Sequence, residues 1–162
     1  MAEHYEISST VAAQIDKWIE KYPPDHKEAA VMAALIIVQK DCGGWLPTPA
    51  MDAVADYLEM PKIAVYEVAT FYSMYELEPV GRNKIWVCTN ISCGLCGAQK
   101  VVDHLQKRLG VTLGETTEDN RITLKNAECL GACSGAPMMQ VNESYHENLT
   151  PEKIDAILDG LE

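Results

Sequence analysis

CTNISCGLCG, residues 88–97, is the stretch on which the fold prediction depends. A short β-rich run at 84–88 leads into it. An amphipathic run at 95–109 follows, with Leu95 among the apolar residues that we expect to face one way. A strand followed by a helix of this kind is one step of an α/β arrangement.

The residues after this stretch continue the same pattern. Alternating apolar residues predict a strand over 121–125, and a second short strand is expected at 138–141. Thr150-Pro151 then opens a last amphipathic helix. The order of strand, helix, strand, strand and helix predicts a small α/β domain.

The first half of the chain has a helical pattern instead. Apolar spacing predicts helices over 8–21 and 27–41, the second apolar nearly all round and therefore central. Two more helices are expected. Thr48, as a capping residue followed by Pro49, predicts the start of the third, and Pro61 predicts the start of the fourth. Four short helices with short links predict a bundle.

A break in the pattern separates the two halves. Residues 78–83, Glu-Pro-Val-Gly-Arg-Asn, interrupt the helical spacing. We therefore predict a helical bundle domain at 1–80 and an α/β domain at 81–162. The expected fold class is α+β.

Composition excludes several classes of protein. The 162 residues are 48% hydrophobic and 23% charged, as in globular domains, and the net charge of −11 disfavours binding to nucleic acid or to an anionic membrane surface. The longest apolar run, at 29–38, is too short to cross a bilayer, so no direct membrane insertion is expected. The N-terminal residues resemble no signal or transit peptide, which predicts a cytosolic or already processed chain.

The six cysteines are clustered, and clustered cysteines in a reducing compartment indicate metal or redox chemistry. Cys88 and Cys93 form one pair and Cys129 and Cys133 a second, each in a glycine-containing loop after a predicted strand. Four thiolates from two loops are what a [2Fe–2S] cluster requires. Cys42 stands alone and is expected to be a buried thiol at a helix end.

The charges around these loops suit an anionic cofactor. A [2Fe–2S] unit with four thiolates is doubly negative and gains a further negative charge on reduction. No Asp or Glu occurs over 79–102, where Arg82, Lys84 and Lys100 do occur, and 129–142 carries no charge. We expect these three cations, with the helix N-terminus near Cys93, to favour the reduced state.

Three other assignments use the same cysteines. Cys93-x-x-Cys96, between a strand and a helix, is the arrangement of a thioredoxin-like thiol–disulfide oxidoreductase, in which Pro137 would be the functional proline. Cys88-x4-Cys93-x2-Cys96 matches the first three ligands of a plant-type ferredoxin. A structural zinc site is the third alternative.

A Rieske centre is disfavoured because it needs two histidine ligands. His104 and His146 lie outside the cysteine motif and are expected to face solvent.

The chain also carries a family resemblance in three segments of the second half: CTNISCGLCG at 88–97, GETTEDNRITL at 114–124 and ECLGACSGAPMMQVN at 128–142. With VATFYSMY at 68–75 and PVGR at 79–82, it resembles the family of the thioredoxin-like [2Fe–2S] subunit of bacterial NADH–quinone oxidoreductase, which is the 24 kDa or E subunit of respiratory complex I.

The resemblance implies a cofactor, a ligand set and a partner. The ligands of that family fall here on Cys88, Cys93, Cys129 and Cys133, which would bind one [2Fe–2S] cluster, while Cys96 occupies a position that is not a ligand. The chain would exchange single electrons with FMN in the flavin- and NADH-binding subunit of the same complex, and would hold no FMN, NADH or catalytic residue itself. Similar subunits occur in NAD-linked hydrogenases and formate dehydrogenases.

The resemblance also implies a location in the cytoplasm, in the peripheral arm of an inner-membrane complex. We expect part of the aromatic surface of the first half to dock the flavoprotein subunit, because aromatic residues are enriched at interfaces. The aromatic residues concerned are Trp18, Trp45, Phe71, Tyr72 and Tyr75. Four thiolate ligands predict a one-electron potential of about −400 mV.

Overall fold

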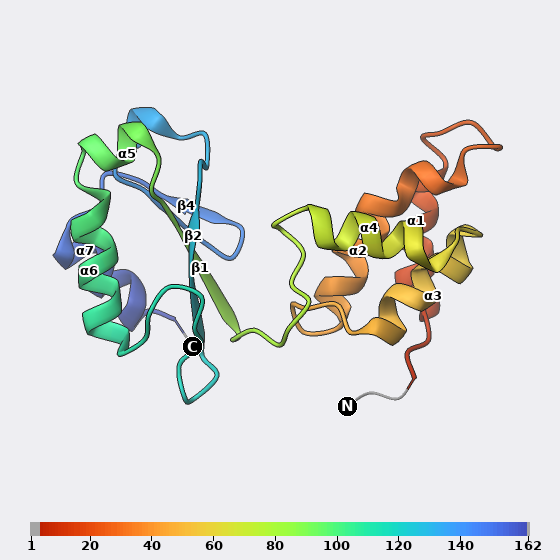
Figure 1. Cartoon of the computed structure of the whole chain (residues 1–162), viewed down its shortest axis with the longest axis horizontal. Coiled ribbons are helices and arrows are strands. Elements are labelled where there is room, and N and C mark those ends of the chain that lie inside the picture. Colours follow the sequence, from red (N-terminus) through yellow and green to blue (C-terminus); the bar gives the residue numbers. More distant parts are fainter. Residues whose placement is uncertain (1–3, 162) are drawn as a thin grey trace. The chain divides into compact units, whose positions relative to one another are not determined.

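The computed structural model describes residues 4–161 (Figure 1). Contacts divide the chain into two compact units, of which the first ends at Pro79 and the second begins at Val80. The first unit is helical, and the second is a four-stranded mixed sheet with helices, as the predicted α+β class requires. Within the described residues, no helix is both long enough and apolar enough to cross a membrane.

The first unit contains four α-helices and one 3-10 helix among its described residues. They are α1 (Ser9–Ile19), η1 (Lys27–Ala30), α2 (Val31–Asp41), α3 (Thr48–Leu58) and α4 (Lys62–Phe71). The helix α2 is the central one, as predicted, because Ala34, Leu35 and Val38 are completely buried. Gly44 donates its N–H to the Gln39 carbonyl at 2.8 Å, so the glycines after α2 end it.

Two details of the helical half differ from the sequence prediction. The run at 27–41 begins as the 3-10 helix η1, and α2 itself starts only at Val31. Thr48 is the first residue of α3 rather than its cap, since the capping position is held by Pro47, which makes no side-chain hydrogen bond. Pro49 occupies the first turn, where its missing N–H costs nothing.

The second unit places its strands in the order β2-β1-β3-β4. The strands are β1 (Asn83–Cys88), β2 (Ile122–Ala127), β3 (Met139–Val141) and β4 (Ser144–His146). β1 runs parallel to β2 and antiparallel to β3, and β3 runs antiparallel to β4. The helices are α5 (Ile91–Leu95), α6 (Ala98–Leu109), η2 (Cys133–Gly135) and α7 (Pro151–Asp159).

Helices α6 and α7 lie on the same face of the sheet (Figure 1). Alternate strand residues, such as Ile85 and Leu124, are fully buried in one core with Leu105 of α6 and Ile154 of α7. This burial supplies most of the stability of the unit, at about 1.5–3 kcal/mol for each large apolar side chain.

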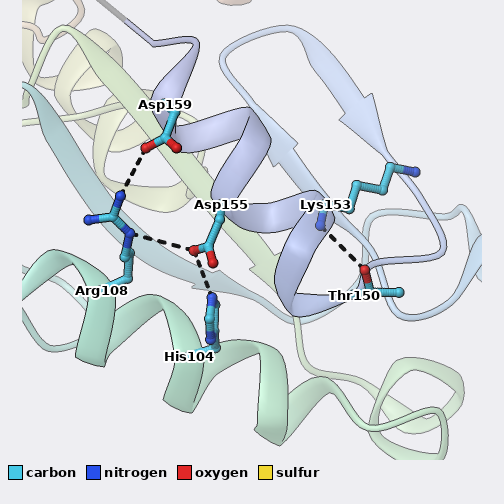
Figure 2. A network of polar contacts seen from close by, with 6 residues as sticks. All are labelled: His104, Arg108, Thr150, Lys153, Asp155 and Asp159. Carbon is cyan, nitrogen blue, oxygen red and sulfur yellow. Dashed lines mark hydrogen bonds and ion pairs between the residues drawn. The ribbon is translucent and has the colours of Figure 1, made fainter.

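Polar pairs connect α6 to α7 and show that the two helices run in the same direction (Figure 2). His104 Nε2 lies 2.9 Å from Asp155 Oδ1, and Arg108 Nη2 donates to Asp159 Oδ1 at 2.9 Å. The second pair follows the first by one helical turn on both helices. The prediction that His104 faces solvent is therefore wrong, because it is partly buried against α7.

The sequence prediction placed Leu95 on the inner face of one long helix, and this is also wrong. The chain forms the five-residue helix α5, turns at Gly97 with φ +95°, and begins α6 only at Ala98. Leu95 is left 85% exposed. β4 was not predicted either; it pairs with β3 across the two-residue link Asn142-Glu143.

Gly81 lies at a close approach of two backbone segments, and its replacement tests the packing of the second unit. A Cβ at Gly81 would lie 2.9 Å from the backbone nitrogen of Ile122, which cannot move without distorting β2. We predict that Gly81→Ala lowers the free energy of unfolding by about 1–3 kcal/mol in urea titrations. Gly160→Ala, whose Cβ would meet nothing nearer than 3.5 Å, is the control and should change it by less than about 0.5 kcal/mol. Equal effects of the two substitutions would contradict the packing argument.

Candidate metal centre

The site is built at the edge of the sheet where β1 and β2 both end. Their parallel pairing places Cys88, the last residue of β1, beside Ala127, the last residue of β2. Thr89 then donates its N–H to the Ala127 carbonyl at 3.1 Å. The two loops that carry the cysteine pairs therefore leave the sheet side by side.

The first loop forms the short helix α5, which turns Cys93 inward. Asn90 caps α5, because its side-chain oxygen accepts the Ile91 N–H at 2.7 Å. Cys93 is 2% exposed and Cys88 is 4% exposed, whereas Ile91 and Leu95 point away from the core. The thiols of the first pair therefore face the interior of the unit.

The second loop keeps its cysteines at the surface. Gly131, at φ +75°, donates its N–H to Cys129 Sγ at 3.4 Å. Cys133 begins η2, and both Cys129 and Cys133 are exposed. The loop is fixed from β4, since the Tyr145 hydroxyl donates to the Leu130 carbonyl at 2.8 Å.

The structure brings the four predicted ligand cysteines together. The Cys88 thiol is within hydrogen-bonding reach of the thiols of Cys93 and Cys129, and the charge of Cys133 acts on Cys93. The thiols of Cys88, Cys93 and Cys129 therefore meet between the two loops, and Cys133 is near enough for its charge to act on Cys93. The buried pair supplies one side of this group of thiols, and the exposed pair supplies the other.

The pKa values of the two buried thiols diverge. Burial raises the pKa of Cys88, but hydrogen bonds from the backbone N–H groups of Asn90 and Leu130, and from the neighbouring thiols, outweigh it and lower this pKa below its ordinary value. Burial and the hydrogen bond with Cys88 raise the pKa of Cys93 to about 11. Backbone N–H groups aimed at a sulfur stabilise a thiolate, which is the form that binds iron.

The remaining cysteines lie elsewhere. Cys96 ends α5 and is exposed, and the Cys93 thiol hydrogen-bonds with Cys88 and the Met138 backbone rather than with Cys96. Cys42 is a partly buried thiol at the end of α2, packed against the core of the first unit. Over residues 4–161, no three His, Cys, Asp or Glu side chains are grouped in the geometry that would hold a single metal ion.

A positive potential is directed at these loops by two helices. α6 follows the first loop directly, and the start of α7 is bound to the second loop, where Asn148 N–H donates to the Gly135 carbonyl and Leu149 N–H to the Pro137 carbonyl. Since α6 and α7 run parallel, both present their N-terminal ends, which carry partial positive charge, to the cysteine-bearing edge. Only one helix was expected in this role from the sequence.

The structure places two of the three expected cations on different elements of the second unit. Lys84 is at the start of β1, four residues before Cys88, or about 13 Å away at about 3.3 Å per residue. Lys100, in the first turn of α6, lines a pocket with Cys96 and Pro137 at the cysteine-bearing edge. Charges beyond about 10 Å are largely screened, so of the three cations we expect Lys100, at the start of the helix that follows the first loop, to affect the cluster more than Lys84 does.

Comparison with known proteins identifies the fold and the cofactor. The sequence pattern of the thioredoxin-like [2Fe–2S] ferredoxins matches residues 15–162. The chain belongs to the thioredoxin-like [2Fe–2S] ferredoxin family. Its cofactor is therefore a [2Fe–2S] cluster, as predicted, and the four convergent thiols fit the four-cysteine requirement of such a cluster.

Relatives within the family are subunits of NADH–quinone oxidoreductase. The chain is 48% identical over 143 residues to the E subunit of that enzyme from Rickettsia bellii, covering 88% of this chain and 86% of the relative. It is 43% identical over 151 residues to the second E subunit of Rhizobium meliloti, covering 93% and 88%. The predicted resemblance to the E subunit, an electron-transfer component of that enzyme, is confirmed.

A solved structure supports the fold. A chain of an NAD⁺-reducing [NiFe]-hydrogenase in the air-oxidised state superimposes with a TM-score of 0.67 at 21% identity over 77% of this chain. This ferredoxin spans only 22% of that hydrogenase chain.

The position of Lys100 at the start of α6 gives a test in the cluster-loaded ferredoxin. We predict that Lys100→Gln lowers the reduction potential by about 18 mV, a twofold change in the equilibrium constant of a one-electron couple. Lys84→Gln should change it by less, because its charge is farther away and more strongly screened. EPR-monitored redox titrations of both variants at low and moderate salt measure the effect. A larger shift for Lys84→Gln would contradict this assignment.

Proposed function

We propose that Cys88, Cys93, Cys129 and Cys133 ligate one [2Fe–2S] cluster, through which the chain exchanges single electrons with FMN of the NADH-oxidising flavoprotein subunit. The observation that carries the proposal is the convergence of four thiols from two loops at the common end of β1 and β2. Relatives at 43–48% identity are E subunits of NADH–quinone oxidoreductase, which supports this host complex.

When bound, the cluster supplies a low-potential one-electron couple of about −400 mV, the range of all-thiolate [2Fe–2S] ferredoxins. The residues of the chain hold and tune it. Buried Cys88 and Cys93 anchor one side, and the N–H groups of Asn90, Leu130 and Gly131 donate to the ligand sulfurs. The N-termini of α6 and α7 offset the negative charge that reduction adds.

The proposed setting is the cytoplasmic peripheral arm of an inner-membrane complex. The fold match to an NAD⁺-reducing hydrogenase chain is the observation that favours a second candidate, the equivalent subunit of a NAD-linked hydrogenase. The two candidates share the ligand set and the flavoprotein partner. Co-purification from the native host with either quinone reductase or hydrogenase activity distinguishes them.

The proposed docking surface for the flavoprotein on the first unit is the outer side of α4. Phe71 is 79% exposed and Ile63 is 64% exposed. The Phe71 ring packs edge-on against Tyr72 with centroids 4.9 Å apart, so an aromatic group is held in place for a partner. Tyr75 is buried and its hydroxyl donates to the Met32 carbonyl, which makes it a core residue and removes it from the candidate surface.

The ligand set is tested by single substitutions to alanine. We predict that removing Cys88, Cys93, Cys129 or Cys133 abolishes the cluster or destabilises it, because one iron then loses one of its two thiolate ligands. Cys42→Ala and Cys96→Ala are matched controls and should retain about two irons per chain. Iron analysis with visible absorption after anaerobic purification measures the result. Loss of the cluster in Cys96→Ala, with retention in Cys133→Ala, would favour plant-type ligation instead.

The α4 surface is tested with the purified flavoprotein subunit. We predict that Phe71→Ser weakens binding by about 1–3 kcal/mol, the typical cost of losing an interfacial aromatic anchor. Tyr22→Ser, which removes an exposed ring beyond the end of α1, should change affinity little. Calorimetry gives both affinities. Unchanged affinity in Phe71→Ser would remove α4 from the interface.

A further inference from the structure

We propose that Tyr145 is a positioning residue for the cluster, whose hydroxyl raises the reduction potential by orienting and polarising the peptide group between Leu130 and Gly131. Tyr145 acts in this way only if Cys88 and Cys129 are ligands, so the inference rests on the proposed function. It adds a residue of β4, outside both cysteine loops, to the groups that set the potential.

One peptide group connects Tyr145 to a ligand sulfur. The Tyr145 hydroxyl donates to the Leu130 carbonyl at 2.8 Å. The Gly131 N–H donates to Cys129 Sγ at 3.4 Å. This carbonyl and this N–H belong to the same peptide unit, which is planar and trans, so that they point in opposite directions. The tyrosine hydroxyl and the sulfur therefore lie at the two ends of one chain of hydrogen bonds.

This chain of hydrogen bonds favours the reduced state of the cluster. Successive hydrogen bonds polarise one another, by about 10–30% per bond, so a donor on the carbonyl makes the N–H of the same peptide group a stronger donor. Reduction adds negative charge to the cluster and its thiolates, and hydrogen bonds to the sulfurs are among the factors that set the potential. The hydroxyl therefore stabilises the reduced form more than the oxidised form.

The same hydroxyl fixes the direction of the peptide group. Gly131 has a φ of +75°, and because a glycine tolerates positive and negative φ equally well, its own conformational preference does not hold this peptide in one orientation. A rotated peptide would turn its N–H away from Cys129. The N–H of Leu130 itself donates to the Cys88 thiol. By holding Leu130 in place, the hydroxyl supports hydrogen bonds to two ligand sulfurs, one buried and one exposed.

Tyr145 is held by the sheet that also positions the ligands. It pairs in register with Gln140 of β3, and β3 pairs with β1, the strand that ends at Cys88. A tyrosine side chain has two rotatable angles, so fixing its hydroxyl costs little conformational entropy. Its side chain is 50% exposed and contributes less to packing than the fully buried core residues do. The hydroxyl, rather than ring burial, is therefore the functional part of this residue.

The test uses the full-length, cluster-loaded protein. Tyr145→Phe removes the hydroxyl and keeps the ring, and replacement of Tyr145 by para-aminophenylalanine restores a donor at the same place. Tyr57→Phe is the matched control, because it removes a tyrosine hydroxyl that donates to Asp16 Oδ1 at 2.6 Å in the first unit. The readouts are iron content, the potential from EPR-monitored titration, and resonance Raman spectra in light and heavy water, which report hydrogen bonds to the ligand sulfurs.

We expect Tyr145→Phe to retain about two irons per chain and to lower the potential by at least about 18 mV, a twofold change in the one-electron equilibrium constant. The deuterium sensitivity of its iron–sulfur bands should decrease. The para-aminophenylalanine variant should recover the potential, and Tyr57→Phe should leave it unchanged.

A purely structural role would lower the iron content of Tyr145→Phe but leave the potential of the loaded molecules as in the wild type. That result, a raised potential, or complete loss of the cluster would overturn the assignment of Tyr145. Failure of the ligand set has a different signature, namely a wild-type protein without a [2Fe–2S] EPR signal, or a cluster that survives in Cys129→Ala.

Discussion

The parallel pairing of β1 with β2 is the constraint on which the site depends. It brings Cys88 and Ala127 to the same sheet edge, so two cysteine pairs far apart in sequence leave the sheet from neighbouring positions. The core beneath, where Ile85 and Leu124 pack against α6 and α7, fixes this register, because a slip by one residue would turn the apolar side chains to the other face. The position of the thiols is therefore a consequence of core packing rather than of contacts among the thiols.

The electrostatics of the edge follow from the same topology. Because α6 and α7 both return along one face of the sheet in the same direction, their N-terminal ends point to the end at which β1 and β2 finish. The pairs His104–Asp155 and Arg108–Asp159 join the two helices at matching positions (Figure 2). A doubly negative cofactor in an acidic chain thus meets partial positive charge from two helices and loop segments without charged residues of their own, although the Glu147 side chain lies against Gly135 of the second loop.

Much of this architecture could be predicted from the sequence where a pattern was long enough. The central apolar run predicted α2, and the spacing of Val101, Val102 and Leu105 predicted the inner face of α6. The five residues of α5 are too few to show a helical period, so Leu95 was assigned to the next helix and to the core. The pairing of His104 with Asp155 joins residues 51 positions apart, and no local signal encodes it. The separation of Lys84 from Cys88 could have been predicted, because both lie in the β-rich run at 84–88 and each strand residue adds about 3.3 Å.

The ligand cysteines could not be assigned from sequence spacing alone, unlike most helices and strands. Spacing showed two pairs in loops after strands, but it left thiol–disulfide, plant-type and zinc assignments open, and only family resemblance selected among them. The structure adds that the four proposed ligands converge while Cys96 is exposed. The most direct test of this account is the iron and sulfide content of anaerobically reconstituted protein, combined with EPR during a redox titration. We predict about two irons and two sulfides per chain, and one EPR signal that appears with a one-electron slope near −400 mV. A colourless protein that binds one zinc, or a two-electron slope without an EPR signal, would contradict it.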